Sequence, residues 1–94
     1  MGTINTNDLG ALSGEVSVID SSAIGIFIDD SSGSHNNHVI TLQASPDGTL
    51  WQDTDTTITG LGYRHAPICA NKVRLKVSAD EGSESICTIA LDKC

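Results

Sequence analysis

Short alternations of apolar and polar residues dominate the hydrophobic pattern of this chain. Residues 15–20 alternate, residues 24–29 place an isoleucine at every second position, and residues 39–45 place Ile40 and Leu42 on one face. Because successive side chains of a strand point to opposite faces, a period of two indicates half-buried β-strands. No run keeps a helical period over three turns, so the pattern predicts an all-β protein.

The strongest turn signal is Ser-Pro-Asp-Gly at residues 45–48. Proline presets φ at the second turn position, and glycine supplies a positive φ at the exit. Strand-like runs precede and follow this turn, so we expect a β-hairpin that joins residues 39–45 to a chain passing Leu50 and Trp51. The Thr-rich residues 53–60 are expected to form a short, edge-like strand.

Two further strands are predicted near the C-terminus, at residues 72–77 and 85–91, whereas the glycine- and proline-interrupted residues 61–71 are expected to be irregular. Six to seven short strands with turns about every 8–12 residues are typical of a β-sandwich. We therefore expect a small antiparallel β-sandwich, jelly-roll-like or Ig-like, as a single domain over residues 15–94.

Residues 1–14 are polar, with three glycines and scattered apolar residues. We expect an extended N-terminal arm outside the core, docked on a neighbouring copy, because terminal segments of this composition fray unless something holds them. The polar residues Asn5, Asn7 and Asp8 of this arm are therefore interface candidates.

The charge balance disfavours some partners. The chain has 94 residues, of which 12 are acidic and 5 basic, for a formal net charge of −7. This balance disfavours coating of DNA or RNA. No apolar run approaches the roughly 18 residues that span a bilayer, and no basic segment with an apolar run follows Met1. We expect no nucleic-acid or membrane partner, and a protein made and kept in a cytoplasm or in an assembly formed there.

The positive charges are confined to the last third of the chain. Residues 1–63 carry 8 carboxylates and no cation, whereas Lys72, Arg74 and Lys76 line one face of a single predicted strand. One interpretation is a solvated outer face with acidic cross-strand neighbours. The other is a heterologous interface, in which this stripe contacts the acidic part of another copy.

Motifs of catalysis are absent from the sequence. There is no glycine-rich phosphate loop, no Gly-x-Ser-x-Gly turn and no credible Ser/His/Asp order. A thin sandwich with one Phe, one Trp and one Tyr also leaves little volume for a pocket. We predict that the protein is not an enzyme, with no catalytic residue, cofactor or resident metal.

Two motifs have residue types found in metal sites. His35 and His38 have His-x-x-His spacing in the polar residues 30–38, and we interpret them as solvated loop histidines. Residues 53–57 resemble the start of an EF-hand calcium loop, but the glycine required at the sixth position is missing. A looser calcium site in the sandwich loops, using Asp29, Asp30 or Asp47, stays open.

The three cysteines, Cys69, Cys87 and Cys94, have no Cys-x-x-Cys pair and therefore no zinc-site spacing. Cys87 lies in an apolar strand pattern, which favours a small buried side chain over a Cys69–Cys87 disulfide. Cys94 is open as a free thiol or an intermolecular link. No neighbouring residue marks a general base, so none is predicted to be an activated nucleophile.

Trp51 is the only tryptophan and stands beside the hairpin turn. We expect it to anchor the core. The alternative is an exposed carbohydrate-binding surface that combines Trp51, Tyr63 and residues 30–38.

The hairpin Val-Ile-Thr-Leu-Gln-Ala-Ser-Pro-Asp-Gly-Thr-Leu-Trp at residues 39–51 is followed about twenty residues later by Lys-Val-Arg-Leu-Lys-Val at 72–77. This layout resembles small β-sandwich virion proteins of tailed bacteriophages and, more weakly, discoidin-type jelly-roll modules. The resemblance extends roughly over residues 24–91.

The phage resemblance implies a capsid decoration (cement) protein that is located in the virion and stabilises contacts between major capsid protein subunits. It implies binding to copies of itself, most commonly as a homotrimer, and N-terminal arms that reach neighbouring subunits. A tail or head–tail adaptor protein is an alternative with the same fold. The discoidin-type resemblance implies a carbohydrate- or lipid-binding module instead.

Overall fold

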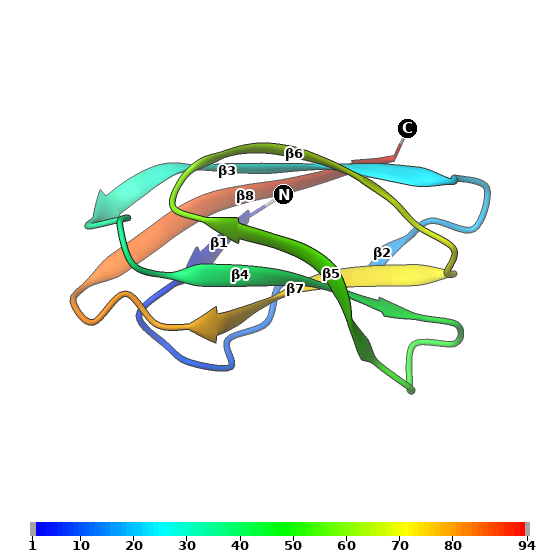
Figure 1. Cartoon of the computed structure of the whole chain (residues 1–94), viewed down its shortest axis with the longest axis horizontal. Helices are drawn as coiled ribbons and strands as arrows, with labels where there is room; N and C mark the ends of the chain where they lie inside the picture. Colours follow the sequence, from blue (N-terminus) through cyan, green and yellow to red (C-terminus); the bar gives the residue numbers. More distant parts are fainter. Residues whose placement is uncertain (1, 94) are drawn as a thin grey trace.

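The structure, a computed structural model, describes residues 2–93 and places eight strands in two antiparallel sheets, one above the other in Figure 1. The first sheet has the order β1 (Gly2–Asn5), β8 (Ser85–Lys93), β3 (Ala23–Gly33), β6 (Gly62–Pro67). The second has the order β2 (Val16–Ser17), β7 (Lys72–Ala79), β4 (Val39–Ser45), β5 (Gln52–Thr59). The predicted antiparallel β-sandwich is confirmed, with eight strands instead of six to seven.

The strand order identifies the kind of sandwich. β1 pairs with β8, β2 with β7, β3 with β6 and β4 with β5, all antiparallel. The chain is thus a long double-stranded ribbon whose successive pairs alternate between the two sheets. This is the order of a jelly roll.

The core lies between the sheets and is aliphatic. Ile24, Ile26 and Ile28 of β3 face the inward side chains of β4 and β7, and all are at most 3% exposed. In β7 the alternation predicted from residues 72–77 is confirmed, because Val73, Leu75 and Val77 are fully buried while the cations between them point outward.

The N-terminal segment differs from the expected arm. Gly2–Asn5 pairs with β8 as an edge strand, and Ile4 is buried. Farther along, the N–H groups of Gly10 and Ser13 donate to the carbonyl oxygens of Val77 and Leu75 at 2.9 Å. The free edges of β8 and β7 supply these backbone partners, which overrides the weak strand propensity of a Gly- and Asn-rich sequence.

The segment expected to be irregular also contains a strand. Gly62–Pro67 forms β6 and pairs with β3, and the proline stands at the strand end, where a ladder N–H is not required. Tyr63 packs against Phe27 with ring centroids 4.8 Å apart, and its ring covers Gly25. The lack of a side chain at Gly25 makes room for this aromatic contact.

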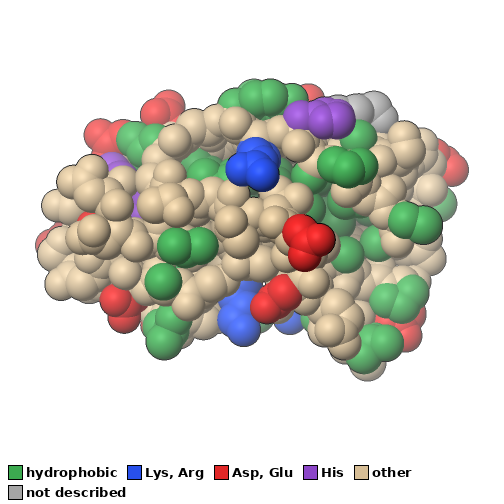
Figure 2. Space-filling model, viewed as in Figure 1, with side chains coloured by type: hydrophobic (Ala, Val, Ile, Leu, Met, Phe, Trp, Pro, Cys, Tyr) green, Lys and Arg blue, Asp and Glu red, His purple; other side chains and the backbone are tan. Residues whose placement is uncertain are grey.

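Residues 2–93 contain no helix that is long and apolar enough to cross a membrane. The face shown in Figure 2 is largely polar, with hydrophobic side chains scattered over it in small groups.

Gly33 ends β3 just after a register shift in the pairing with β8. Its φ is +85°, and a Cβ there would lie 2.0 Å from the carbonyl oxygen of Glu84. We predict that Gly33→Ala lowers the free energy of unfolding by more than about 1 kcal/mol. The alanine would be strained at this φ, and its Cβ would clash with the Glu84 carbonyl oxygen.

Gly14→Ala is the matched control for this prediction, since a Cβ at Gly14 meets nothing within 4 Å. Its unfolding free energy should stay within about 0.5 kcal/mol of the wild type. Urea unfolding of the three proteins measures both effects, and equal stability of Gly33→Ala and wild type would contradict the strained conformation.

Candidate functional site

The predicted basic stripe lies on the outer face of the second sheet. Lys72, Arg74 and Lys76 point outward from β7, which runs between β2 and β4, and all three are half-buried. The stripe therefore runs along an inner strand of the sheet and not along an exposed edge strand.

Arg74 belongs to a chain of contacts that crosses three strands. Its Nε–H donates to Oε1 of Gln43 at 2.8 Å, and Nε2 of Gln43 donates to Oδ1 of Asp53 at 2.8 Å. The guanidinium carbon lies 4.1 Å from the ring centroid of Trp51, a cation–π contact. We refer to Asp53, Gln43, Arg74 and Trp51 as the outer-face network.

Trp51 is outside the core, so its predicted role as a core anchor is wrong. It precedes β5, is half-buried, and its indole Nε1–H donates to the carbonyl oxygen of Gly48 at 3.1 Å. The hairpin turn places the ring on the outer face of the sheet, where it closes the turn and lies under the Arg74 guanidinium.

The hairpin turn itself forms as its residues predict. The Ser45 hydroxyl accepts from the backbone N–H of Gly48 at 2.7 Å, and Asp47 Oδ1 accepts from the N–H groups of Thr49 and Leu50 at 2.8 and 3.0 Å. The N–H groups of Leu50 and Thr49 hold the pKa of Asp47 below its ordinary value, because they stabilise the ionised form.

The charge separation along the sequence is not a separation in space. Glu15 lies beside β2 and its carboxylate is 3.7 Å from Nζ of Lys72, while Asp53 of β5 ends the outer-face network. Acidic and basic side chains lie near one another on the face shown in Figure 2. The reason is topological, since β7 of the second half pairs with β2 and β4 of the first half.

The polar interface candidates of the N-terminal segment form a turn. Oδ1 of Asn5 accepts from the N–H of Asn7, the N–H of Asp8 donates to the carbonyl oxygen of Asn5, and Oδ1 of Asn7 accepts from the N–H of Gly82. This turn is exposed and lies against the β7–β8 connection.

The two aromatic residues of the carbohydrate-binding alternative are not brought together. Tyr63 is on β6 of the first sheet and packs on Phe27, whereas Trp51 lies on the second sheet under Arg74. Residues 30–38 do not complete such a surface either, because β3 extends to Gly33 and His38 is buried.

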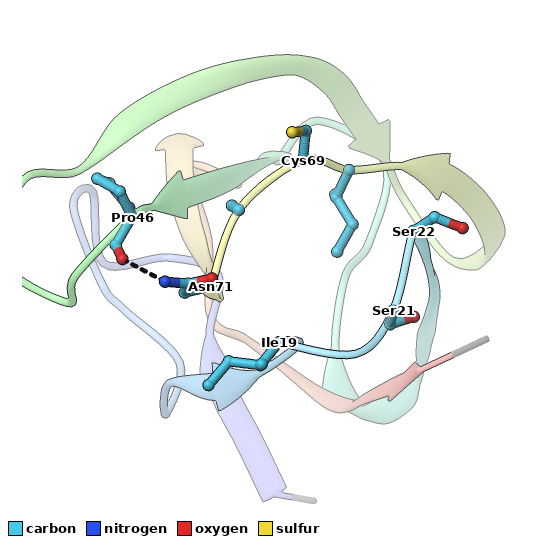
Figure 3. A pocket seen from close by; sticks show the side chains of 8 residues that line it. Ile19, Ser21, Ser22, Pro46, Cys69 and Asn71 are labelled. Atoms are coloured by element: carbon cyan, nitrogen blue, oxygen red, sulfur yellow. Dashed lines mark hydrogen bonds between the residues drawn. The ribbon is translucent and has the colours of Figure 1, made fainter.

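An open pocket of about 440 Å³ lies at one end of the sandwich (Figure 3). It is lined by Ile19, Ser21 and Ser22 of the β2–β3 connection, by Pro46 of the hairpin and by residues 68–71. Nδ2 of Asn71 donates to the carbonyl oxygen of Pro46 at 2.7 Å and closes one side. Cys69 is the only ionisable side chain in the lining, so the pocket offers little chemistry.

The opposite end of the sandwich contains the polar groups with the most unusual surroundings. His38 is fully buried, with Nδ1 3.1 Å from Oε1 of Glu81 and Nε2 3.0 Å from the carbonyl oxygen of Gly60. The prediction that it is a solvated loop histidine is therefore wrong. The β5–β6 and β7–β8 connections supply polar partners that make its burial tolerable.

Glu81 is the buried acceptor at this end. Its carboxylate accepts from the backbone N–H groups of Asn37 and His38 as well as contacting the His38 ring. Chiefly through the Asn37 N–H, these contacts hold the pKa of Glu81 below its ordinary value, against the opposing effect of burial.

His35 is also mostly buried, and it links the loop to β8. Its Nε2 lies 2.6 Å from Oδ1 of Asp30, and its Nδ1 lies 3.0 Å from Oγ of Ser85 and 3.3 Å from Sγ of Cys87. The Ser85 hydroxyl is in turn hydrogen-bonded to Thr6, at the end of β1. His35 thus has polar contacts at both ring nitrogens and is not a solvated loop residue either.

Cys87 is fully buried, as predicted. Burial raises the pKa of its thiol, and the carboxylates of Asp30 and Glu81 raise it further because they disfavour a second negative charge. Cys87 and the exposed Cys69 are both free, so the alternative of a disulfide between them is not realised. Cys94 lies outside the described residues.

Within residues 2–93, the only group of three side chains able to hold a metal ion consists of His35, His38 and Cys87, whose ligand atoms all lie within 4.8 Å of one another. Asp29, Asp30 and Asp47 belong to no such group among the described residues. In the sequence, only the His-x-x-His spacing indicated this site. Cys87 and Glu81 lie more than forty positions from the histidines, so no sequence pattern connected them with the site.

We predict that Glu81 contributes to stability in a pH-dependent way. Its pKa is lower in the folded protein than its ordinary value of 4.5, so as the pH falls the unfolded chain takes up this proton first. The contribution is present above about pH 4.5 and is lost as the pH falls through the folded-state pKa. Glu81→Gln should therefore be less stable than wild type at pH 7 and lose less stability on acidification.

Urea unfolding at several pH values from about 7 to 3 measures this effect. Glu84→Gln, at an exposed position in the same connection, removes the same charge and is the matched control. If Glu81→Gln and Glu84→Gln gave the same pH dependence, the role of the buried carboxylate would be contradicted.

No family model matches this chain. Comparison with curated proteins and with solved structures gives no match either. A function must therefore be inferred from the residues of this chain and their geometry.

Proposed function

We propose that this protein is a non-enzymatic structural protein of a tailed-bacteriophage virion, a capsid decoration protein that binds neighbouring subunits of the major capsid protein. The observation that carries the proposal concerns the two segments of the phage-like pattern, residues 39–51 and 72–77. They form one unit, because β4 and β7 are neighbours and Gln43 stands opposite Arg74. Their outward side chains make the outer-face network.

The outer-face network has the properties of a docking surface. Arginine and tryptophan are enriched at the energetic centres of protein interfaces, and here Arg74 and Trp51 already hold each other in place. Side chains ordered before binding lose less conformational entropy when a partner covers them. Lys72 and Lys76 flank Arg74 along β7 and supply charges for steering and register.

The remaining surface suits several weak contacts. Within residues 2–93, Lys72–Glu15 is the only ion pair between a lysine or arginine and a carboxylate. Most of the 12 acidic residues therefore have no lysine or arginine partner among the residues that the structure describes. These carboxylates could form ion pairs with the cations of a partner subunit, including the basic stripe of another copy. Linked copies, as in a homotrimer, gain affinity because each further contact is intramolecular.

The jelly-roll order supports this class of function, since viral capsid proteins use such double-sheet folds. Lectins use them too, but Arg74 covers one face of the Trp51 ring, which leaves less of it for stacking on a sugar. The decoration role is therefore the one that the arrangement favours.

We predict that charge reversal of the stripe weakens capsid binding. Lys72→Glu/Lys76→Glu should bind expanded capsids that lack the protein at least about tenfold more weakly than wild type, because like charges would face the partner. Co-sedimentation at increasing protein concentration measures the affinity. Arg64→Glu/Lys93→Glu, at exposed positions of the first sheet, changes the charge equally and should bind as wild type does.

Equal binding of the two double variants would place the contact elsewhere on the molecule, and failure of the wild-type protein to bind capsids would overturn the proposal. Mass spectrometry of purified virions then locates the protein. A copy number comparable with that of the major capsid protein supports decoration, whereas the number expected of a single ring supports a tail or head–tail adaptor.

A further inference from the structure

We propose that His35, His38 and Cys87 form a binding site for one divalent transition-metal ion of the zinc class. The site lies at the end of the sandwich where the β3–β4 connection, residues 34–38, meets β8. It is remote from the outer-face network and does not depend on the function proposed above. Two imidazoles and one thiolate are ligands that zinc prefers, and three protein ligands leave a fourth position open.

His35 is already oriented as a ligand. A carboxylate only accepts hydrogen bonds, so the 2.6 Å contact with Asp30 means that Nε2 carries the proton and donates it. The lone pair of Nδ1 then lies on the side of Ser85 Oγ, 3.0 Å away, and of Cys87 Sγ, 3.3 Å away, and a bound ion would replace the Ser85 contact. With Zn–N near 2.1 Å and Zn–S near 2.3 Å, tetrahedral ligand atoms stand about 3.6 Å apart, so this pair is close to the required separation.

The contact between Asp30 and His35 is also the usual outer contact of a metal-bound histidine. A carboxylate on the second ring nitrogen fixes the tautomer and raises the basicity of the ligating nitrogen. Glu81 makes the corresponding contact with Nδ1 of His38. Both histidines of the site thus have a carboxylate partner.

His38 supplies the third ligand after a small adjustment. The three ligand atoms lie within 4.8 Å of one another, and the two histidine rings are 6.0 Å apart between centroids. His38 binds as neutral imidazole by exchanging the Gly60 carbonyl oxygen at Nε2 for the ion, while Nδ1 keeps its contact with Glu81. Both histidines lie on a connection between strands, which can close the remaining distance more readily than β8.

The local charge favours a cation. Asp30 and Glu81 place two carboxylates around the cluster. A divalent ion stabilises the Cys87 thiolate directly. On binding, the S–H bond of Cys87 breaks as the bond from Sγ to the metal forms. The thiol proton, and any proton on the ligating nitrogen of His38, pass to solvent without electron transfer.

The same atoms also resemble a thiol nucleophile with its base, in the order Cys87, His35, Asp30. Access argues against this reading. Cys87 is fully buried, its thiol pKa is raised, and the open pocket lies at the opposite end of the sandwich. Sγ is thus not accessible to an organic substrate, whereas the neighbouring Asp30 is exposed to ions in solution.

Titration of the reduced full-length protein with Co²⁺, followed by Zn²⁺, tests the proposal. We expect one equivalent of Co²⁺ to bind, with a sulfur-to-cobalt charge-transfer absorption that Zn²⁺ abolishes, and proton release on binding. Cys69→Ser/Cys94→Ser should behave as wild type, since Cys69 is exposed and outside the cluster. Cys87→Ser should lose the absorption. Absence of binding, or binding unchanged in Cys87→Ser, would overturn the proposal.

Two further variants keep the test decisive if Cys87→Ser fails to fold. His35→Gln, at a partly exposed ligand, should abolish the one-equivalent binding, whereas His65→Gln on β6 should not. Asp30→Asn should weaken Zn²⁺ binding by about 10–100-fold, the usual effect of losing a carboxylate partner. Asp29→Asn removes the same charge from the neighbouring residue and should leave the affinity unchanged. Equal affinities of these two aspartate variants would contradict the assigned geometry.

Discussion

The pairing of the last two strands with strands from the start of the chain is the constraint on which this structure depends. β7 lies between β2 and β4, and β8 lies between β1 and β3. Neither sheet is complete without its late strand. β1 and β2 have no strand partner until β8 and β7 are in place, and β3 and β4 each have only one of their two neighbours. Backbone hydrogen bonds across distant segments, together with the buried faces of β7 and β8, therefore hold the fold. Such non-local pairing is typical of slowly folding β-proteins.

The same pairing assembles the polar cluster at the end of the sandwich. β8 brings Cys87 to His35, and the connection between β7 and β8 brings Glu81 to His38. The histidines lie on the only connection between β3 and β4, where the chain passes from one sheet to the other. Burial of these groups is stabilised by their mutual contacts, so the cluster and the closure of this end of the sandwich are physically one feature.

The outer-face network belongs to a different part of the molecule and suggests a different role. It rests on the middle of the second sheet, where β4, β5 and β7 hold Gln43, Asp53 and Arg74 side by side. The outer-face network consists of ordered, partly charged side chains, whereas the cluster at the end of the sandwich brings together possible ligands of a single ion. The two features are compatible because they occupy different parts of the molecule.

The sequence by itself determined the features that depend on neighbouring residues. Period-two patterns located β3, β4, β7 and β8, and Ser45 to Gly48 formed the expected turn because its hydrogen bonds are local. Only the tertiary structure decided the rest. Gly2–Asn5 and Gly62–Pro67 became strands because β8 and β3 offered them backbone partners. Trp51 lies outside the core because the hairpin turn places its ring on the outer face, against Arg74. His38 was buried because Glu81 and Gly60, distant in the chain, satisfied its ring nitrogens, and no local pattern encodes such a meeting.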